Sequence, residues 1–284
     1  MNKKWHLYDT LWLLIFIVVL FLFMNNLRLQ NDRPHTIIEV TRVNQAKEYF
    51  DSANQDTLIL CDIDSTLTTP SDPYWQRQAI QRHNEIYQKY VADFDKHQLC
   101  IFLHLITLQS PAQLLEKEWT IVIQKLQQRG IKIFGFTASK MTAIGKKVNR
   151  FSSWRHQELA RFGIDFSMSF PGTYVFENLE DFGGEHPGIE KGIIYTGQKI
   201  KKGDVLETVF NTLKWIPPKL IVIDDKIDNI KSCEDVLKKL FPQIYFVGIH
   251  YKGVEKLPRT ITQSRIFEKN IKILAEQVKQ ITKE

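Results

Sequence analysis

The sequence is poor in cysteine and lacks the residue spacings that build common metal sites. Its three cysteines, Cys61, Cys100 and Cys233, lie far apart and include no CxxC pair. They cannot form a closed disulfide framework, although one bridge between Cys100 and Cys233 stays open. Cys61 lies in an apolar run and is expected to be a small core residue. The eight histidines show no HExxH or HxxxH spacing, which argues against a zinc site.

The chain also lacks a block of charge of one sign. Of its 284 residues, 25% are charged and 43% hydrophobic, with a formal net charge of +6 and an isoelectric point near 9.0. Lysines and arginines are interspersed with acids, as on an ordinary solvated surface, so we expect no nucleic-acid partner. The length suffices for one domain with a sizeable core, or for a domain with an insertion, and the composition excludes a disordered or collagenous chain.

One long hydrophobic run stands near the N-terminus. Residues Leu11–Met24 are all apolar and follow the lysines Lys3 and Lys4. The run is short for a bilayer crossing of about 20 residues, but the residues after it lack the small side chains of a signal-peptide cleavage site. We therefore predict an uncleaved signal anchor over residues 1–30, with a cleaved signal peptide and secretion as the alternative.

The charges beside this run predict where the rest of the chain lies. Positive charge before a membrane span favours a cytoplasmic N-terminus, which places the remainder on the extracytoplasmic side, the periplasm if the protein is bacterial. Residues 31–54 are expected to form a tether that leads into the first helix or strand of a domain covering residues 55–284.

Beyond the tether, short apolar runs alternate with helical patterns. Such alternation predicts strand–helix–strand units and an α/β fold with a mostly parallel sheet. The predicted strands are Thr57–Ile63, Ile131–Phe136, Lys219–Ile223 and Ile244–Ile249.

Proline and glycine mark several expected helix ends. Asp72 and Ser110 each precede a proline, which predicts a capped helix start at both places, and Gly130 is expected to end a helix just before a strand. Three further amphipathic helices are predicted, one capped by Asp204 and two covering residues 228–240 and 261–281.

Two segments interrupt the alternation. Residues 68–109 are too many for a simple crossover loop and carry polar and aromatic residues at helical spacing, so we expect a helical cap there. Its aromatic residues, Trp75 among them, are expected to form the core of this cap. Its arginines Arg77 and Arg82 do not indicate which substrate binds. A turn-rich segment at residues 167–197 predicts a smaller hairpin excursion.

The first predicted strand runs into two aspartates, Asp62 and Asp64. Residues two apart in an extended chain point the same way, so both carboxylates are expected to project together while Ile63 turns into the packing. At the carboxyl end of a parallel strand they face the crevice where such sheets bind ligands. Taken alone, the pair has an ordinary alternative, an acidic turn after a strand.

Three other element ends supply groups that suit phosphate chemistry. They are the hydroxyls of Thr137 and Ser139, the carboxylates of Asp224 and Asp225, and the lysines Lys199, Lys201 and Lys202. Phosphoryl transfer needs an in-line nucleophile, a divalent cation that offsets charge, and fixed donors around the phosphoryl oxygens. Magnesium suits a site of a few carboxylates with water and substrate phosphate. The set predicts a Mg²⁺ site that handles a small phosphorylated substrate.

The order of these motifs resembles the haloacid dehalogenase superfamily of phosphohydrolases, and most closely a bacterial branch with an N-terminal membrane segment. The resemblance spans roughly residues 58–249. "DIDST" matches the DxDx[TV] loop, Thr137 the hydroxyl-bearing second strand end, Lys202 in "KKGDVL" the lysine, and "DDKIDN" the acidic fourth motif. The resemblance implies a Rossmann-like three-layer α/β/α sandwich whose helical cap is inserted after the first motif.

The resemblance also implies roles for the acidic residues. Asp62 would attack phosphorus to form an aspartyl-phosphate, and Asp64 would protonate the leaving group and then activate the hydrolytic water. The carboxylates of Asp62 and Asp225, with the backbone carbonyl of Asp64, would hold Mg²⁺. Asp224 and Asp228 would lie beside the metal or orient its waters, and the choice between Asp224 and Asp225 as the direct ligand stays open.

The remaining motif residues would bind the phosphoryl group. Thr137, with Ser139 beside it, would donate hydrogen bonds to phosphoryl oxygens. Lys202 would neutralise charge between nucleophile and phosphate, with Lys201 and Lys199 as alternatives because only one of the three lysines should point inward.

These expectations lead to one main hypothesis of function and two alternatives. The main hypothesis is a membrane-anchored, Mg²⁺-dependent phosphatase that hydrolyses a phosphomonoester. The presence of Asp64 favours ester hydrolysis, because dehalogenase members lack the second aspartate. The alternatives are a non-catalytic binding protein on the same fold and a phosphotransferase that uses an acceptor other than water. The sequence predicts neither the physiological substrate nor the oligomeric state.

Overall fold

The computed structural model describes residues 35–144, 148–181, 185–197, 199–258 and 260–283, together with Trp12 and Phe16. Apart from those two residues, the predicted signal anchor at residues 1–30 lies outside the described residues. Within the described ranges, no helix combines the length and the apolar character that a membrane crossing requires.

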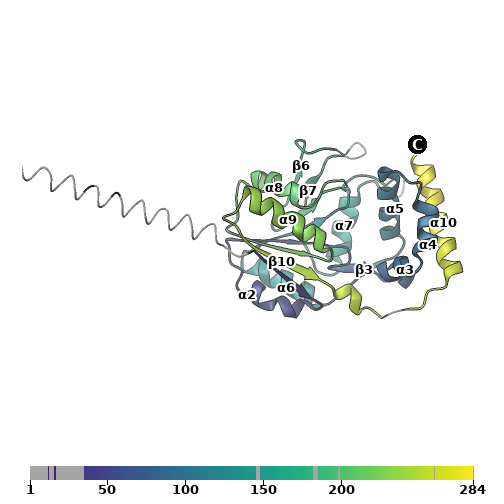
Figure 1. The fold of residues 1–284 in the computed structure, drawn as a ribbon, viewed down its shortest axis with the longest axis horizontal. Helices are drawn as coiled ribbons and strands as arrows, with labels where there is room; N and C mark the ends of the chain where they lie inside the picture. Colours follow the sequence, from purple (N-terminus) through teal and green to yellow (C-terminus); the bar gives the residue numbers. More distant parts are fainter. Residues whose placement is uncertain are drawn as a thin grey trace, which may run out of the picture.

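A central eight-stranded sheet organises the described chain (Figure 1). Neighbouring strands run parallel from β1 to β8, and β7 and β6 add an antiparallel edge. The predicted α/β class with a mostly parallel sheet is confirmed. In sheet order the strands are β1 (Thr36–Val40), β10 (Tyr245–Tyr251), β9 (Lys219–Asp224), β2 (Thr57–Cys61), β5 (Lys132–Thr137), β8 (Ile193–Tyr195), β7 (Gly188–Glu190) and β6 (Thr173–Val175).

The central strands are apolar on both faces because helices cover both. Every residue of β2 is buried, which explains why its sequence shows no alternation. β2 pairs with β5 on one side and with β9, which comes later in the chain, on the other side. A crevice therefore opens at the carboxyl ends of these strands, where parallel sheets bind ligands.

The sheet begins earlier in the chain than the sequence suggested. β1 pairs in parallel with β10 from Thr36 onward, upstream of the boundary expected near residue 55. The helices that follow, η1 (Val43–Ala46) and α2 (Lys47–Asp51), bury Phe50 against Trp119.

Helices cover the two faces of the sheet and complete the three layers (Figure 1). On one face α2 lies with α6 (Glu118–Gln128) and α7 (Phe151–Ala160), around a cluster that contains Trp119 and Leu159. On the other face η3 (Gly203–Val205), α8 (Leu206–Leu213) and α9 (Ile227–Leu240) bury Val209 and Leu237. This Rossmann-like three-layer sandwich is the architecture that the resemblance implied.

The insertion after β2 forms a helical layer beside the crevice. It consists of β3 (Thr68–Pro70), η2 (Pro73–Trp75), α3 (Arg77–Arg82), α4 (Asn84–Val91), α5 (Lys96–Leu108) and β4 (Ala112–Leu114), with β3 and β4 paired antiparallel.

The C-terminal helix α10 (Ser264–Ile281) joins the insertion although it is remote in sequence. It packs against α4 and α5 (Figure 1). A third apolar cluster, with Trp75 and Phe102 from the insertion and Phe267 and Leu274 from α10, forms the core of this layer. The sequence predicted the aromatic core but not that α10, which follows η4 (Gly253–Lys256), completes it.

Two predicted helix caps are wrong. Ser110 starts no helix: its hydroxyl accepts from the backbone N–H of Asp72 at 2.9 Å, and the next helix begins only at Glu118. Asp204 lies exposed inside η3, where no side-chain cap bond forms. The Asp72 cap is confirmed, because its carboxylate accepts from Tyr74 N. The φ of +72° at Gly130 is the left-handed geometry that ends α6.

The structure decides whether a disulfide bridge joins Cys100 and Cys233. Cys61, Cys100 and Cys233 are all buried and free, so no bridge joins Cys100 to Cys233.

Candidate active site

The two aspartates of the first motif, Asp62 and Asp64, lie in a tight loop after β2. They are not on one extended strand, where residues two apart would point the same way. Asp62 N donates to Ile223 O at 2.8 Å, as in a continued parallel ladder. Ser65 then takes a positive φ of 67°, and its N–H donates back to Thr68 O. The Asp62 side chain is 9% exposed, whereas the Asp64 side chain is 45% exposed and has different partners.

Lys202 is the lysine that points inward. It is 2% exposed, and its Nζ lies 2.6 Å from Asp62 Oδ1 and 2.6 Å from Asp224 Oδ2, while it also donates to Phe136 O. Lys199 instead pairs with Glu180, and Lys201 is exposed.

A close helix approach holds Lys202 in place. A Cβ on Gly203 would lie 2.0 Å from the Ser232 carbonyl oxygen of α9, so only glycine lets the chain next to Lys202 pack this tightly. The N–H of Gly203 donates to Ser232 Oγ at 3.0 Å and fixes the approach.

Three buried carboxylates gather beside this lysine. Oxygen atoms of Asp62, Asp224 and Asp225 all lie within 4.8 Å of one another. Asp224 accepts from Lys202, from the backbone N–H of Lys226 and from the side-chain amide of Asn229. Thr66 Oγ1 donates to the second oxygen of Asp62 at 2.9 Å.

Asp225 and Asp228 have different surroundings. Asp225 lines the cleft and forms an ion pair with Arg77 of α3. Asp228 lies outside the carboxylate cluster: it is exposed and lines a neighbouring cavity, and Asn229 contacts Asp224 instead.

The charges in this cluster are unbalanced. Burial raises the pKa of Asp62 to about 8, with Lys202 acting in the opposite direction. Burial, reinforced by the negative charge of Asp224, raises the pKa of Asp225 to about 6. Burial alone would lower the pKa of Lys202, but the carboxylates of Asp224 and Asp62 outweigh it and raise that pKa. Among the described residues, the three carboxylates form direct ion pairs with two cationic side chains, Lys202 and Arg77.

The donor set fits a hard divalent cation. All the clustered ligand atoms are carboxylate oxygens, which Mg²⁺ prefers, and an added cation would offset the mutual repulsion of these buried carboxylates. Asp225 opens onto the cleft, whereas Asp224 is already held by Lys202 and Asn229.

Asp64 is held by a buried arginine that the sequence analysis missed. Arg155 of α7 is 1% exposed, and its Nη2 lies 2.8 and 3.0 Å from the two oxygens of Asp64. Its Nη1 donates to Glu158 at 2.7 Å, and its guanidinium lies over the rings of Phe151 and Trp154. Arg155 and Glu158 are three residues apart on a helix, a spacing that indicates an ion pair between them. The spacing does not indicate that Arg155 also binds Asp64.

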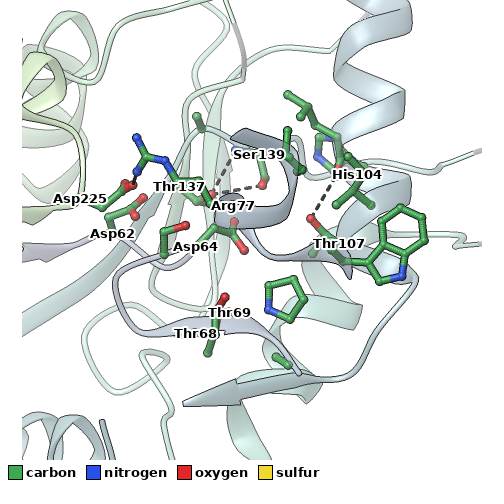
Figure 2. A pocket seen from close by; sticks show the side chains of 18 of the residues that line it. Asp62, Asp64, Thr68, Thr69, Arg77, His104, Thr107, Thr137, Ser139 and Asp225 are labelled. Carbon is green, nitrogen blue, oxygen red and sulfur yellow. Dashed lines mark hydrogen bonds and ion pairs between the residues drawn. The ribbon is translucent and has the colours of Figure 1, made fainter. Parts of the chain in front are cut away.

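The hydroxyl groups of the second motif complete the site. Thr137 ends β5, and its Oγ1 accepts from Ser139 N at 3.1 Å and donates to Ser139 Oγ at 3.2 Å. Both residues line the same cleft of about 410 Å³ as Asp62 and Asp64. Figure 2 shows Asp62 and Asp225 side by side, with Thr137 and Ser139 nearby.

The insertion lines the other side of the cleft. Besides Arg77, its contribution is mostly apolar and hydroxyl-bearing, as seen around His104 and Thr107 in Figure 2. These cleft-lining residues are Thr68, Thr69, Pro70, Trp75, Ile80, Gln81, Leu103, His104, Ile106, Thr107, Ser110 and Ala112.

His104 is already satisfied by its neighbours. Its Nδ1 donates to Cys100 O at 2.7 Å, and its Nε2 accepts from Lys140 N at 3.1 Å. Burial lowers the pKa of His104 to about 4, so the ring is neutral in this network.

Comparisons with known proteins place the whole domain in one family. The chain is 26% identical over 236 residues to an uncharacterized protein of Rickettsia felis, covering 76% of this chain and 77% of the relative. It is 28% identical over 211 residues to the uncharacterized protein RP296 of Rickettsia prowazekii, covering 73% of each. No solved structure matches. The model of the family described as "Protein of unknown function (DUF2608)" matches residues 39–283, and the chain therefore belongs to that family.

Proposed function

We propose that this protein is a Mg²⁺-dependent phosphatase of the haloacid dehalogenase type, which hydrolyses a small phosphomonoester through an aspartyl-phosphate. The observation that carries the proposal is the position of Lys202: a buried ammonium bonded to both Asp62 and Asp224 at the carboxyl ends of β2 and β9. Burying a lysine between two acids costs desolvation energy, and such buried charge clusters are concentrated at functional sites.

In the first step Asp62 acts as the nucleophile. One of its carboxylate oxygens attacks phosphorus and forms the O–P bond while the bond from phosphorus to the ester oxygen breaks. Asp64 donates a proton to that departing oxygen, so an alcohol leaves. Lys202 and Thr66, which contact the two oxygens of Asp62, hold the nucleophile in one rotamer.

In the second step water attacks the aspartyl-phosphate at phosphorus. Asp64, now ionised, takes the proton from this water, and the bond from Asp62 to phosphorus breaks to release inorganic phosphate. Thr137 and Ser139 supply hydroxyl donors to the phosphoryl oxygens, a role that their places on the cleft wall permit.

Magnesium would be held by Asp62 and Asp225 with the backbone carbonyl of Asp64, while Asp224 orients this group and anchors Lys202. When bound, the cation supplies charge neutralisation at the phosphoryl oxygens.

The N-terminal segment indicates where in the cell the proposed phosphatase would act. Leu11–Met24 follows two lysines and would anchor the chain, with the domain on the extracytoplasmic side. Secretion after cleavage is the alternative, and the size of the full-length protein in membrane and soluble fractions separates the two.

The proposal is tested by hydrolysis of an aryl phosphate by the full-length protein, with Mg²⁺ and with a chelator. The Asp62→Asn variant should lose at least about 1000-fold in rate, since it removes the nucleophile. Activity that survives both the chelator and the substitution would contradict the proposal. Added alcohol acceptors distinguish transfer from hydrolysis, because a transferase would form new phosphate esters.

A further inference from the structure

Arg77 is the cationic side chain that the insertion brings to the carboxylate cluster. It lies at the first position of α3, and its Nη1 forms an ion pair with Asp225 Oδ2. Asp225 is 5% exposed in its side chain, whereas that of Arg77 is 39% exposed. Among the described residues, Asp225 is the only hydrogen-bond or ion-pair partner of Arg77, so most of the five N–H donors of its guanidinium remain available for a ligand.

The helix that carries Arg77 is anchored by other residues. Gln78 Nε2 donates to Val254 O at 2.5 Å, and Arg82 Nη1 donates to Thr260 O at 2.6 Å. Ala79 is buried in the apolar cluster of the insertion. The Arg77 side chain can therefore change partners without moving α3.

Cavities on both sides of the Arg77–Asp225 ion pair leave room for the Arg77 side chain to change partners. Arg77, Asp225 and Lys226 line the catalytic cleft of about 410 Å³ and also a second cavity of about 420 Å³ next to it. The ion pair thus stands between two cavities, and a guanidinium that leaves Asp225 stays within the cleft where a phosphoryl group would lie.

We infer that Arg77 exchanges partners: it pairs with Asp225 when no cation is bound, and it binds an oxygen of the phosphoryl group once Mg²⁺ occupies Asp225. This inference rests on the proposed function, because it assigns Asp225 to the metal. The planar guanidinium suits a phosphoryl group, which offers several oxygens to its parallel donors. Mg²⁺ and Arg77 compete for Asp225, and metal binding therefore prepares the site for the anion.

The test compares Arg77→Met with Arg82→Met in the full-length protein. Both substitutions remove an arginine from α3, but Arg82 does not line the cleft, and within the described ranges its hydrogen-bond partner is the backbone carbonyl of Thr260. Titration calorimetry measures the affinity for Mg²⁺ alone, and then the affinity for inorganic phosphate at saturating Mg²⁺. Neither measurement needs turnover.

Opposite shifts are expected for Arg77→Met. Affinity for Mg²⁺ should rise about threefold, the size of a partly exposed ion pair, because a competitor for Asp225 is gone. Affinity for phosphate should fall about tenfold or more, because a charged hydrogen bond is lost. Arg82→Met should leave both affinities unchanged.

Other outcomes would overturn the inference. If Arg77→Met weakens both affinities, Arg77 has a structural role, and if it changes neither, Arg77 does not exchange partners. In both cases a wild-type enzyme that hydrolyses aryl phosphate with Mg²⁺ leaves the proposed function standing. A wild-type protein that binds no Mg²⁺ overturns both.

Discussion

The two walls of the cleft are built on different physical principles. The wall formed by the sheet holds Asp62, Asp224 and Lys202 almost completely buried and bonded to one another. The wall formed by the insertion offers mainly apolar and hydroxyl groups and one half-exposed arginine. The sheet wall suits chemistry that needs fixed charges. The insertion wall suits adaptation to a substrate, because its side chains can change position at a low cost in free energy.

The largest effect should come from removing the central charge of the sheet wall. Lys202→Met leaves Asp62 and Asp224 buried without their cation, which should destabilise the fold by about 3–5 kcal/mol. Hydrolysis should slow on the order of 100- to 1000-fold. Denaturant unfolding and steady-state kinetics measure the two effects, and Mg²⁺ should restore part of the stability.

The matched control for that variant is Lys199→Met. Lys199 pairs with Glu180 at the surface, so its loss should leave kinetics unchanged. Equal effects of the two substitutions would mean that the buried cluster has no special role.

A smaller effect is expected from Arg155 of α7, which holds Asp64. In Arg155→Met, Asp64 loses its fixed position, so protonation of the leaving group suffers. Alkyl phosphates, whose alcohols are poor leaving groups, should lose about 100-fold in rate, and p-nitrophenyl phosphate much less.

Arg150→Met is the control for this prediction. Arg150 stands before α7 and pairs with Glu190 at 2.5 Å, away from Asp64. It should not alter the ratio of alkyl to aryl activity. If Arg155→Met lowers both activities by the same factor, Arg155 merely stabilises the fold.

The insertion wall can be weakened without touching the acids. Phe267 of α10 is fully buried, and its ring lies 4.7 Å from that of His83. Phe267→Ala should cost about 3–5 kcal/mol of stability, yet leave Mg²⁺ affinity at the wild-type value, as measured by calorimetry below the unfolding temperature. A large loss of Mg²⁺ affinity would show that the two walls are not independent.

Acid should also act on the insertion wall, through His104. Its pKa is lowered to about 4 in the folded protein, against about 6.5 when unfolded. Its contribution to stability is therefore complete above pH 6.5 and decreases as the pH falls toward 4, by about 3 kcal/mol in all. Urea unfolding between neutral pH and about pH 5 should show a steeper loss for wild type than for His104→Gln. Equal slopes would mean that His104 is already protonated or solvated in the folded state.

The sheet wall was largely predictable from sequence, and the insertion wall was not. Continuous apolar runs ending in Asp62, Thr137 and Asp225 are local signals, and parallel strands bring their carboxyl ends together. The choice of Lys202 over Lys199 and Lys201 was left open, because it depends on the packing of Gly203 against α9.

What sequence reasoning missed are pairs between distant residues. Arg77 meets Asp225 across 148 positions, and Arg155 meets Asp64 across 91. The packing of α10 on the insertion is of the same kind. No local pattern encodes such pairs, and Ser110 shows the same limit, since a serine before a proline resembles a cap yet binds a remote backbone N–H.

The most direct measurement of the central claim is chemical trapping of the intermediate at Asp62. During turnover of an aryl phosphate with Mg²⁺, quenching with borohydride reduces an aspartyl-phosphate to homoserine, which peptide mass spectrometry locates. We expect homoserine at position 62, dependent on substrate and absent from Asp62→Asn. Release of phosphate with Asp62 unmodified throughout would contradict the account.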